Sequence, residues 1–159
     1  MHKPLFCLIV ADSKQDAYDN ANEDLETRIE HSSIDWYQGI IESQRWPEFE
    51  KYDKAIKFNE EIKQVLEKLL DESEFNALKW IDNGISQLEK YRQNQEVDLQ
   101  TAIDSFSIGS GDIHAHILDL TNYSNDFVIS KSMFYKILEY VKEENKLDNL
   151  YVVGFDSHF

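Results

Sequence analysis

Cysteine, proline, glycine and long apolar runs are all scarce in this 159-residue sequence. Its one cysteine, Cys7, can form no internal disulfide, and a lone thiol in an apolar run suits a reducing cytoplasm. Only two prolines and five glycines occur, which argues against a fibrous or disordered chain. The apolar run at residues 5–11 is far shorter than the roughly 20 residues of a membrane span. We therefore expect a single soluble, cytoplasmic domain over residues 1–159.

Basic residues are also few relative to acidic ones. The chain has 16 lysines and arginines against 31 aspartates and glutamates, which gives a formal net charge of −15. Such an excess repels nucleic acid and anionic membrane surfaces, so direct binding to either is not expected. The same charge favours basic surfaces, and we expect a basic protein partner, for example one that itself binds nucleic acid.

Three apolar segments predict strands, over residues 4–11, 113–120 and 150–155. The last two flank a helical segment, so a right-handed crossover would make them parallel neighbours. So few strands set among helical patterns predict an α+β fold, with a small sheet of about three strands packed by helices.

Most of the remaining apolar residues repeat at helical spacing. Two stripes in the middle of the chain, separated by a break near residues 71–73, predict an antiparallel helical hairpin over about 48–92. We interpret this hairpin as an insertion in the single domain. A later helix is predicted to begin after Ser130 or Ser132, because either hydroxyl can cap its first turn.

The first helix, predicted over residues 14–30, begins at a capping box of Ser13 and Asp16. Its acidic residues are spaced by three and four positions, which places them on one helix face. Like charges at this spacing destabilise a helix by roughly a few tenths of a kcal/mol per pair. We interpret the stripe as a surface for a basic partner, engaged as a nucleic-acid mimic; a solvated face is the alternative. The stripe consists of Asp16, Asp19, Glu23, Glu26 and Glu30.

Histidines and a carboxylate occur on the two later predicted strands. His114 and His116 share one strand face, and Asp156 and His158 share a face of the last strand. If these strands are neighbours, the four side chains form a coordination shell for a divalent metal such as zinc or manganese, which would activate water. Solvent-facing histidines are the other interpretation. No cofactor is expected outside this metal alternative.

Aromatic and charged residues cluster between positions 35 and 46. Asp35 and Trp36 are followed by Arg45 and Trp46, which are residue types that anchor interfaces and also fill cores. We identify these four residues as candidate partner contacts, although core packing is the interpretation that the residue types favour. An ion pair between Arg45 and Asp35 is part of this prediction.

Short motifs in this region and at the end of the chain resemble a group of small phage-borne proteins. They are Asp-Trp-Tyr at residues 35–37, Arg-Trp at 45–46 and Asp-x-His at 156–158. Residues 39–44 stand where that group carries a double glycine. The resemblance implies a mobile-element setting and no established activity.

These patterns lead to one main functional hypothesis and two alternatives. The main hypothesis is a small acidic interaction or inhibitor protein, borne by a phage or mobile element, that binds a basic surface of a host protein in the host cytoplasm. The first alternative is a metal-dependent hydrolase that uses the histidine and aspartate set. The second is a structural or assembly subunit that buries the helical hairpin in a homo-oligomer. An enzyme is the less expected class.

Overall fold

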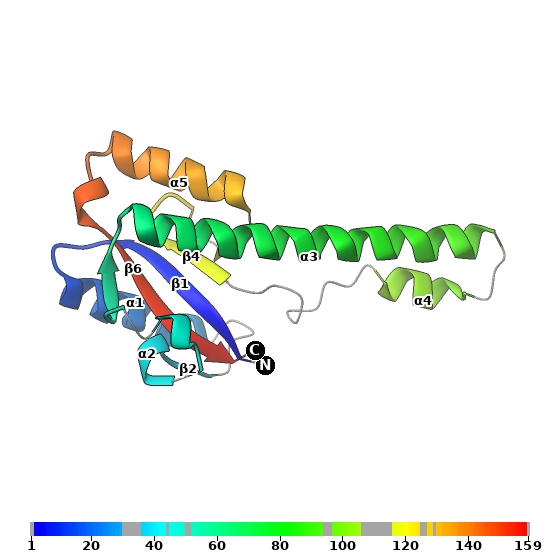
Figure 1. Ribbon diagram of the computed structural model, residues 1–159, viewed down its shortest axis with the longest axis horizontal. Coiled ribbons are helices and arrows are strands. Elements are labelled where there is room, and N and C mark those ends of the chain that lie inside the picture. Colours follow the sequence, from blue (N-terminus) through cyan, green and yellow to red (C-terminus); the bar gives the residue numbers. More distant parts are fainter. Residues whose placement is uncertain are drawn as a thin grey trace.

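The computed structural model of the chain is a mixed sheet with helices on both faces (Figure 1). It describes residues 2–29, 36–43, 45–49, 52–93, 97–105, 116–124, 127–128 and 130–158. The strands are β1 (His2–Val10), β2 (Trp36–Gly39), β3 (Ala55–Lys57), β4 (His116–Leu120), β5 (Phe127–Val128) and β6 (Leu150–His158). The helices are α1 (Lys14–Ile29), α2 (Ile40–Ser43), α3 (Glu60–Arg92), α4 (Leu99–Asp104) and α5 (Lys131–Glu143), with 3-10 turns η1 (Pro47–Phe49) and η3 (Leu147–Asn149).

The α+β class is confirmed, but the sheet is larger than predicted. It has six strands in the order β2-β6-β1-β4-β5, with β3 also paired to β6. β1 runs parallel to β4 and antiparallel to β6. The predicted parallel pairing of the last two strands is wrong, because β1 lies between β4 and β6. β6 is apolar on both faces, so it is stable only inside a sheet covered on both sides.

Two apolar cores lie on the two faces of this sheet. On one face, Phe6 and Leu8 of β1 pack with buried residues of α3 and α5. On the other face, α1 places Ala17, Ala21 and Leu25 against the sheet, at the spacing of four that predicted the helix. Cys7 belongs to this second core, and its burial raises the pKa of the thiol far above the ordinary range.

The predicted helical hairpin at residues 48–92 is wrong. Residues 55–57 form the short strand β3, and α3 then runs without a break for 33 residues, from its Asn59 cap. Near the expected break, Ser73 is buried on the inner side of the helix, and Asp71 is paired with Lys131 of α5. Aspartate, glutamate and serine are only weak helix breakers, so these tertiary contacts override them.

At about 1.5 Å per residue, α3 is about 50 Å long and extends past the edge of the sheet (Figure 1). Figure 1 shows its second half projecting beyond the sheet with α4 alongside. α5 begins as predicted, since the Ser130 hydroxyl oxygen accepts a hydrogen bond from the Met133 N–H (3.1 Å). None of the described helices combines the length and apolarity needed to cross a bilayer.

Candidate functional site

The outer side of α1 carries the predicted acidic stripe. Four carboxylates lie on it, all exposed, while the alanine and leucine residues of the opposite side are buried against the sheet. We call these four residues the acidic face: Asp16, Asp19, Glu23 and Glu26. The fifth predicted member, Glu30, lies outside the described residues.

Hydrogen bonds from uncharged side chains hold three of these carboxylates in place. The three bonds run from Ser13 Oγ to Asp16 Oδ2 (2.6 Å), from Gln15 Nε2 to Asp19 Oδ1 (2.8 Å) and from Asn22 Nδ2 to Glu26 Oε1 (3.1 Å). Ser13 also accepts from the Asp16 N–H, which confirms its role at the start of the helix. Neutral donors order a carboxylate but leave its charge in place.

The two basic residues of α1 are bonded to other acids. Lys14 Nζ lies 3.2 Å from Asp53 Oδ2, and Arg28 Nε pairs with Asp24, a half-buried residue beside the acidic face. Both bases therefore have a counter-charge that is not one of the four carboxylates. The acidic face is ordered but not neutralised by these contacts.

A second cluster surrounds Asp156, at the end of the sheet where β1 begins and β6 ends. The Asp156 side chain is fully buried, with Oδ1 3.2 Å from His2 Nδ1 and Oδ2 3.5 Å from Arg45 Nε. The His2 ring stands edge-on to that of His158 at 5.1 Å. The antiparallel register of β1 and β6 creates this cluster by placing His2 opposite His158.

The geometry of the Asp156 cluster indicates a structural role, because its contacts join β1, β6 and the segment that contains Arg45. A carboxylate withdrawn from water needs nearby positive charge or hydrogen-bond donors, and His2 and Arg45 supply them. Ser157, the next residue on β6, is on the other face of the sheet, where its hydroxyl donates to the Lys3 carbonyl oxygen (3.0 Å). Its hydroxyl is thus committed to holding β1 against β6.

The predicted metal set does not assemble among the described residues. His116 lies opposite Leu5 on the α1 side of the sheet, whereas Asp156 and His158 lie on the other side, with β1 between the two strands. Convergence of these side chains is therefore a wrong prediction for His116, and His114 lies outside the described residues. Within the described ranges, no three histidine, cysteine, aspartate or glutamate side chains are arranged to hold a metal ion.

His116 is instead a buried, neutral histidine. Burial lowers its pKa from 6.5 to about 4, and the nearby Lys3 ammonium acts in the same direction. In the unfolded chain the ring titrates near its ordinary value, so between these two pKa values the unfolded state binds the extra proton. Stability therefore falls as the pH drops below about 6.5, and this loss levels off near pH 4.

We expect His116→Gln to flatten this pH dependence. Between pH 7.5 and 5.2 the wild-type free energy of unfolding should fall by about 1.5–2 kcal/mol more than that of the variant. Urea unfolding at both pH values measures the difference, and pH 5.2 stays above the isoelectric point of about 4.6. Equal pH slopes for the two proteins would contradict a neutral buried His116.

The predicted aromatic cluster divides between core and surface. Trp46 is half-buried against the core on the α3 side, and its Nε1 has no hydrogen-bond partner among the described residues. Arg45 is exposed and reaches Asp156. Asp35, its predicted partner, and the Trp36 side chain lie outside the described part of the chain. Trp46 thus follows the core-packing interpretation.

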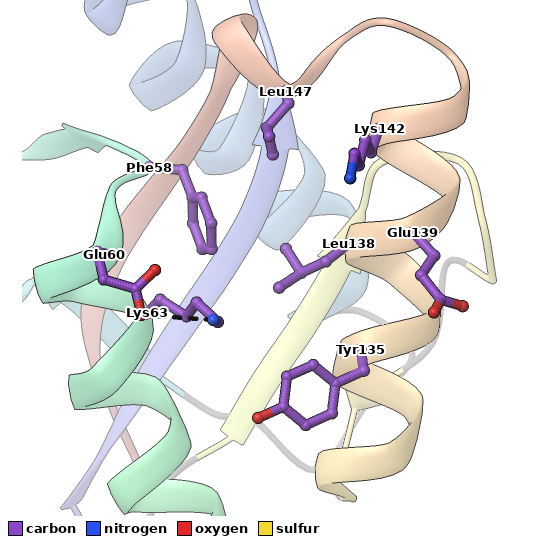
Figure 2. Close-up of a pocket in the computed structure, with 8 residues that line it drawn as sticks. All are labelled: Phe58, Glu60, Lys63, Tyr135, Leu138, Glu139, Lys142 and Leu147. Carbon is purple, nitrogen blue, oxygen red and sulfur yellow. Dashed lines mark hydrogen bonds and ion pairs between the residues drawn. The ribbon is translucent and has the colours of Figure 1, made fainter.

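An open pocket of about 340 Å³ lies between the start of α3 and α5 (Figure 2). Phe58, Leu138 and Leu147 supply its apolar side chains. Lys63 pairs with Glu60 on the α3 side (3.4 Å), and α5 adds one more lysine and one more glutamate. Its described lining contains no cysteine, serine or histidine, so it offers no nucleophile and base pair.

Comparison with known proteins assigns no role to the acidic face, the Asp156 cluster or the open pocket. No protein-family model, curated protein or solved structure matches this chain. The geometry and charge of these three features are therefore the evidence for what each of them can do.

Proposed function

We propose that this chain is an interaction protein that binds a basic protein surface through the acidic face of α1. The observation that carries the proposal is the combination of exposure, order and unneutralised charge on one helix side. Side chains that are already ordered lose little rotamer freedom on binding. Their uncompensated charge attracts a basic partner over a distance and speeds its association.

The spacing of the charges favours a partner that normally binds nucleic acid. The acidic face runs from Asp16 to Glu26, ten positions further along the helix, which is about 15 Å at 1.5 Å per residue, or roughly one charge per 5 Å. A single DNA strand carries one phosphate charge per about 3.4 Å. A groove lined with lysine and arginine accepts both lines of charge. Together with the resemblance to phage-borne proteins, this supports the role of an inhibitor that occupies such a groove in the host cytoplasm.

Neutralising the acidic face tests the proposal. In a variant with Asp16→Asn, Asp19→Asn, Glu23→Gln and Glu26→Gln, partner affinity should fall by about tenfold or more, because exposed ion pairs contribute about 0.2–1 kcal/mol each. Proteins captured from a lysate of the host at low salt are identified by mass spectrometry, and the basic protein most depleted by the variant is purified. Its association rate is then measured against salt concentration.

A matched control removes the same number of charges elsewhere. Glu139→Gln, Glu143→Gln, Glu144→Gln and Asp148→Asn also remove four negative charges, at exposed positions on α5, at its C-cap and on η3. This control should keep nearly all of the affinity and the salt dependence. Equal capture by wild type, variant and control, or no basic protein captured at low salt, would refute a role for the acidic face.

A further inference from the structure

The second half of α3 forms an arm that projects beyond the sheet (Figure 1). α3 is buried against the sheet at Ile62, Leu66 and Leu70, and Ser73 is the last residue of this buried series. Beyond it, α4 lies alongside α3 (Figure 1). We call residues 74–92 the arm; at 1.5 Å per residue it is about 28 Å long.

The arm has one side turned to α4 and another that is apolar and open. Gly84, on the same side as Ser73, is buried, whereas four aliphatic residues on the adjacent side are 39–61% exposed. These four side chains stay exposed, and α5 reaches this side at the base of the arm, where Lys131 contacts Glu74. With its two flanking charges it forms what we call the arm face: Glu74, Leu78, Ile81, Ile85, Leu88 and Arg92.

The spacing and residue type of the apolar positions in the arm face are the same from either end of the helix. Its residues are spaced by four, three, four, three and four positions, and at 100° per residue they fall within about 80° of one helix side. The pattern is symmetric about Asn83. In an antiparallel pair of such helices, Leu78 would therefore meet Leu88 of a second copy, and Ile81 would meet Ile85.

Charge selects this antiparallel arrangement. It sets Glu74 of each copy beside Arg92 of the other, whereas a parallel pair would set like charge against like. Glu74 is positioned at the base of the arm, where its Oε1 accepts a hydrogen bond from the Lys131 N–H (2.7 Å). That neutral donor leaves the negative charge of Glu74 in place.

The arm is also where two chains of net charge −15 can approach. Between residues 74 and 92, three acids (Glu74, Asp82, Glu89) balance three bases (Lys79, Lys90, Arg92), so the arm is neutral. An antiparallel pair holds the two acidic sheet bodies at opposite ends, about 28 Å apart along the helices. Because the Debye length in physiological salt is about 8 Å, their repulsion is largely screened at this distance.

The exposed apolar area is adequate for self-association. Phe75 (67% exposed) lies next to the arm face, whereas Tyr91 lies on the side of Gly84, and an aromatic side chain buries about 150–250 Å². Phe75 and the four aliphatic residues together expose an apolar area on the order of 450 Å² per copy, which is large for a monomer and more than half of the about 800 Å² per partner of a stable interface. We propose that two copies of this chain pair antiparallel through the arm face, about a two-fold axis level with Asn83.

Sedimentation equilibrium on the full chain at micromolar concentrations tests this dimer. We expect twice the 18.7 kDa mass of one chain. Ile85→Glu should raise the dissociation constant by at least about 100-fold, because it buries two carboxylates in an apolar contact. Leu147→Glu is the matched control: Leu147 is 38% exposed on η3, Ile85 is 46% exposed, and the control should still dimerise. A monomer at every concentration, or equal dimerisation of both variants, would overturn the proposal.

Charge reversal tests the antiparallel register. Glu74→Lys and Arg92→Glu should each weaken the dimer, since each places like charges together at both ends. An equimolar mixture of the two variants should restore it as a mixed dimer, which loss of folding in either variant would not allow. Two single variants that dimerise like wild type would overturn the antiparallel pairing.

This dimer does not depend on the proposed function. The chain with a neutralised acidic face should still dimerise, and Ile85→Glu should still present that face, so the two proposals fail separately. If both hold, one particle carries two acidic faces and can engage two basic sites at once, with the gain in avidity that linkage provides.

Discussion

Replacing Asp119 with alanine should lower the free energy of unfolding by about 3–5 kcal/mol. Asp119 is fully buried at the end of β4, and both of its carboxylate oxygens accept hydrogen bonds from the following turn. The donors are Thr121 N (2.9 Å), Thr121 Oγ1 (2.6 Å), Ser124 N (2.7 Å) and Ser124 Oγ (3.1 Å). Alanine would leave these donors without their acceptor. Urea unfolding, or a fall of roughly 10 °C in the melting temperature, measures the loss.

Two variants calibrate this prediction. Asp119→Asn keeps one oxygen acceptor at nearly the same volume and should lose an intermediate amount. Asp148→Ala, at an exposed position of η3, should stay within about 0.5 kcal/mol of wild type. A loss below about 1 kcal/mol for Asp119→Ala would mean that this carboxylate does not organise the turn.

Gly154→Val should also destabilise the protein strongly, by about 2–3 kcal/mol, through overpacking. Valine suits a strand, yet a Cβ at position 154 would lie 2.8 Å from Ile40 Cγ2 and 3.4 Å from Phe6 Cε1. β6 crosses beneath α2 at this point, and only a residue without a side chain leaves room for Ile40. Chemical denaturation reports the change.

A double-mutant cycle isolates the cause of this loss. Ile40→Ala opens the space that the new methyl groups need, so Gly154→Val should cost clearly less in that background than in wild type. Additive losses would show that the Ile40 contact is not what excludes a side chain at position 154.

The strands and helices that were predicted correctly are those whose formation depends on residues close together in the sequence. The apolar run of β1 needs burial on both faces, and the alanine repeat of α1 matches the helix that covers it. The Ser130 cap and the last strand were predicted for the same reason, since a capping hydroxyl and a continuous apolar run act through their neighbours in sequence.

The errors come from contacts between distant segments. Ala55–Lys57 becomes β3 because it pairs with β6, about 100 positions later, and no local pattern indicates that partner. Asp71 and Ser73 looked like a helix break because the contact with Lys131 of α5 is invisible in sequence. The apolar stripe beyond them was assigned to the inside of a hairpin, whereas it lies exposed on the arm.

The candidate sites also divide into one that depends on local sequence and others that depend on contacts between distant segments. The acidic face was predictable because one helix carries all of it at a regular spacing. The Asp156 cluster was missed because His2 and Asp156 are 154 positions apart and meet through the register of β1 and β6. His116 was assigned to the wrong partners because strand order decides which face of which strand a histidine shares.

The position of β1 in the sheet has a consequence for the making of the protein. β1 ends at residue 10, but its two neighbours, β4 and β6, begin at residues 116 and 150. A ribosome that adds about 5–20 residues per second completes them roughly 5–30 s after β1. Throughout that interval the nascent apolar strand has no sheet partner. α1 follows β1 directly and covers one of its faces in the folded protein, so this helix is the first element that can shield the strand, and charged residues of the kind on its outer side oppose aggregation.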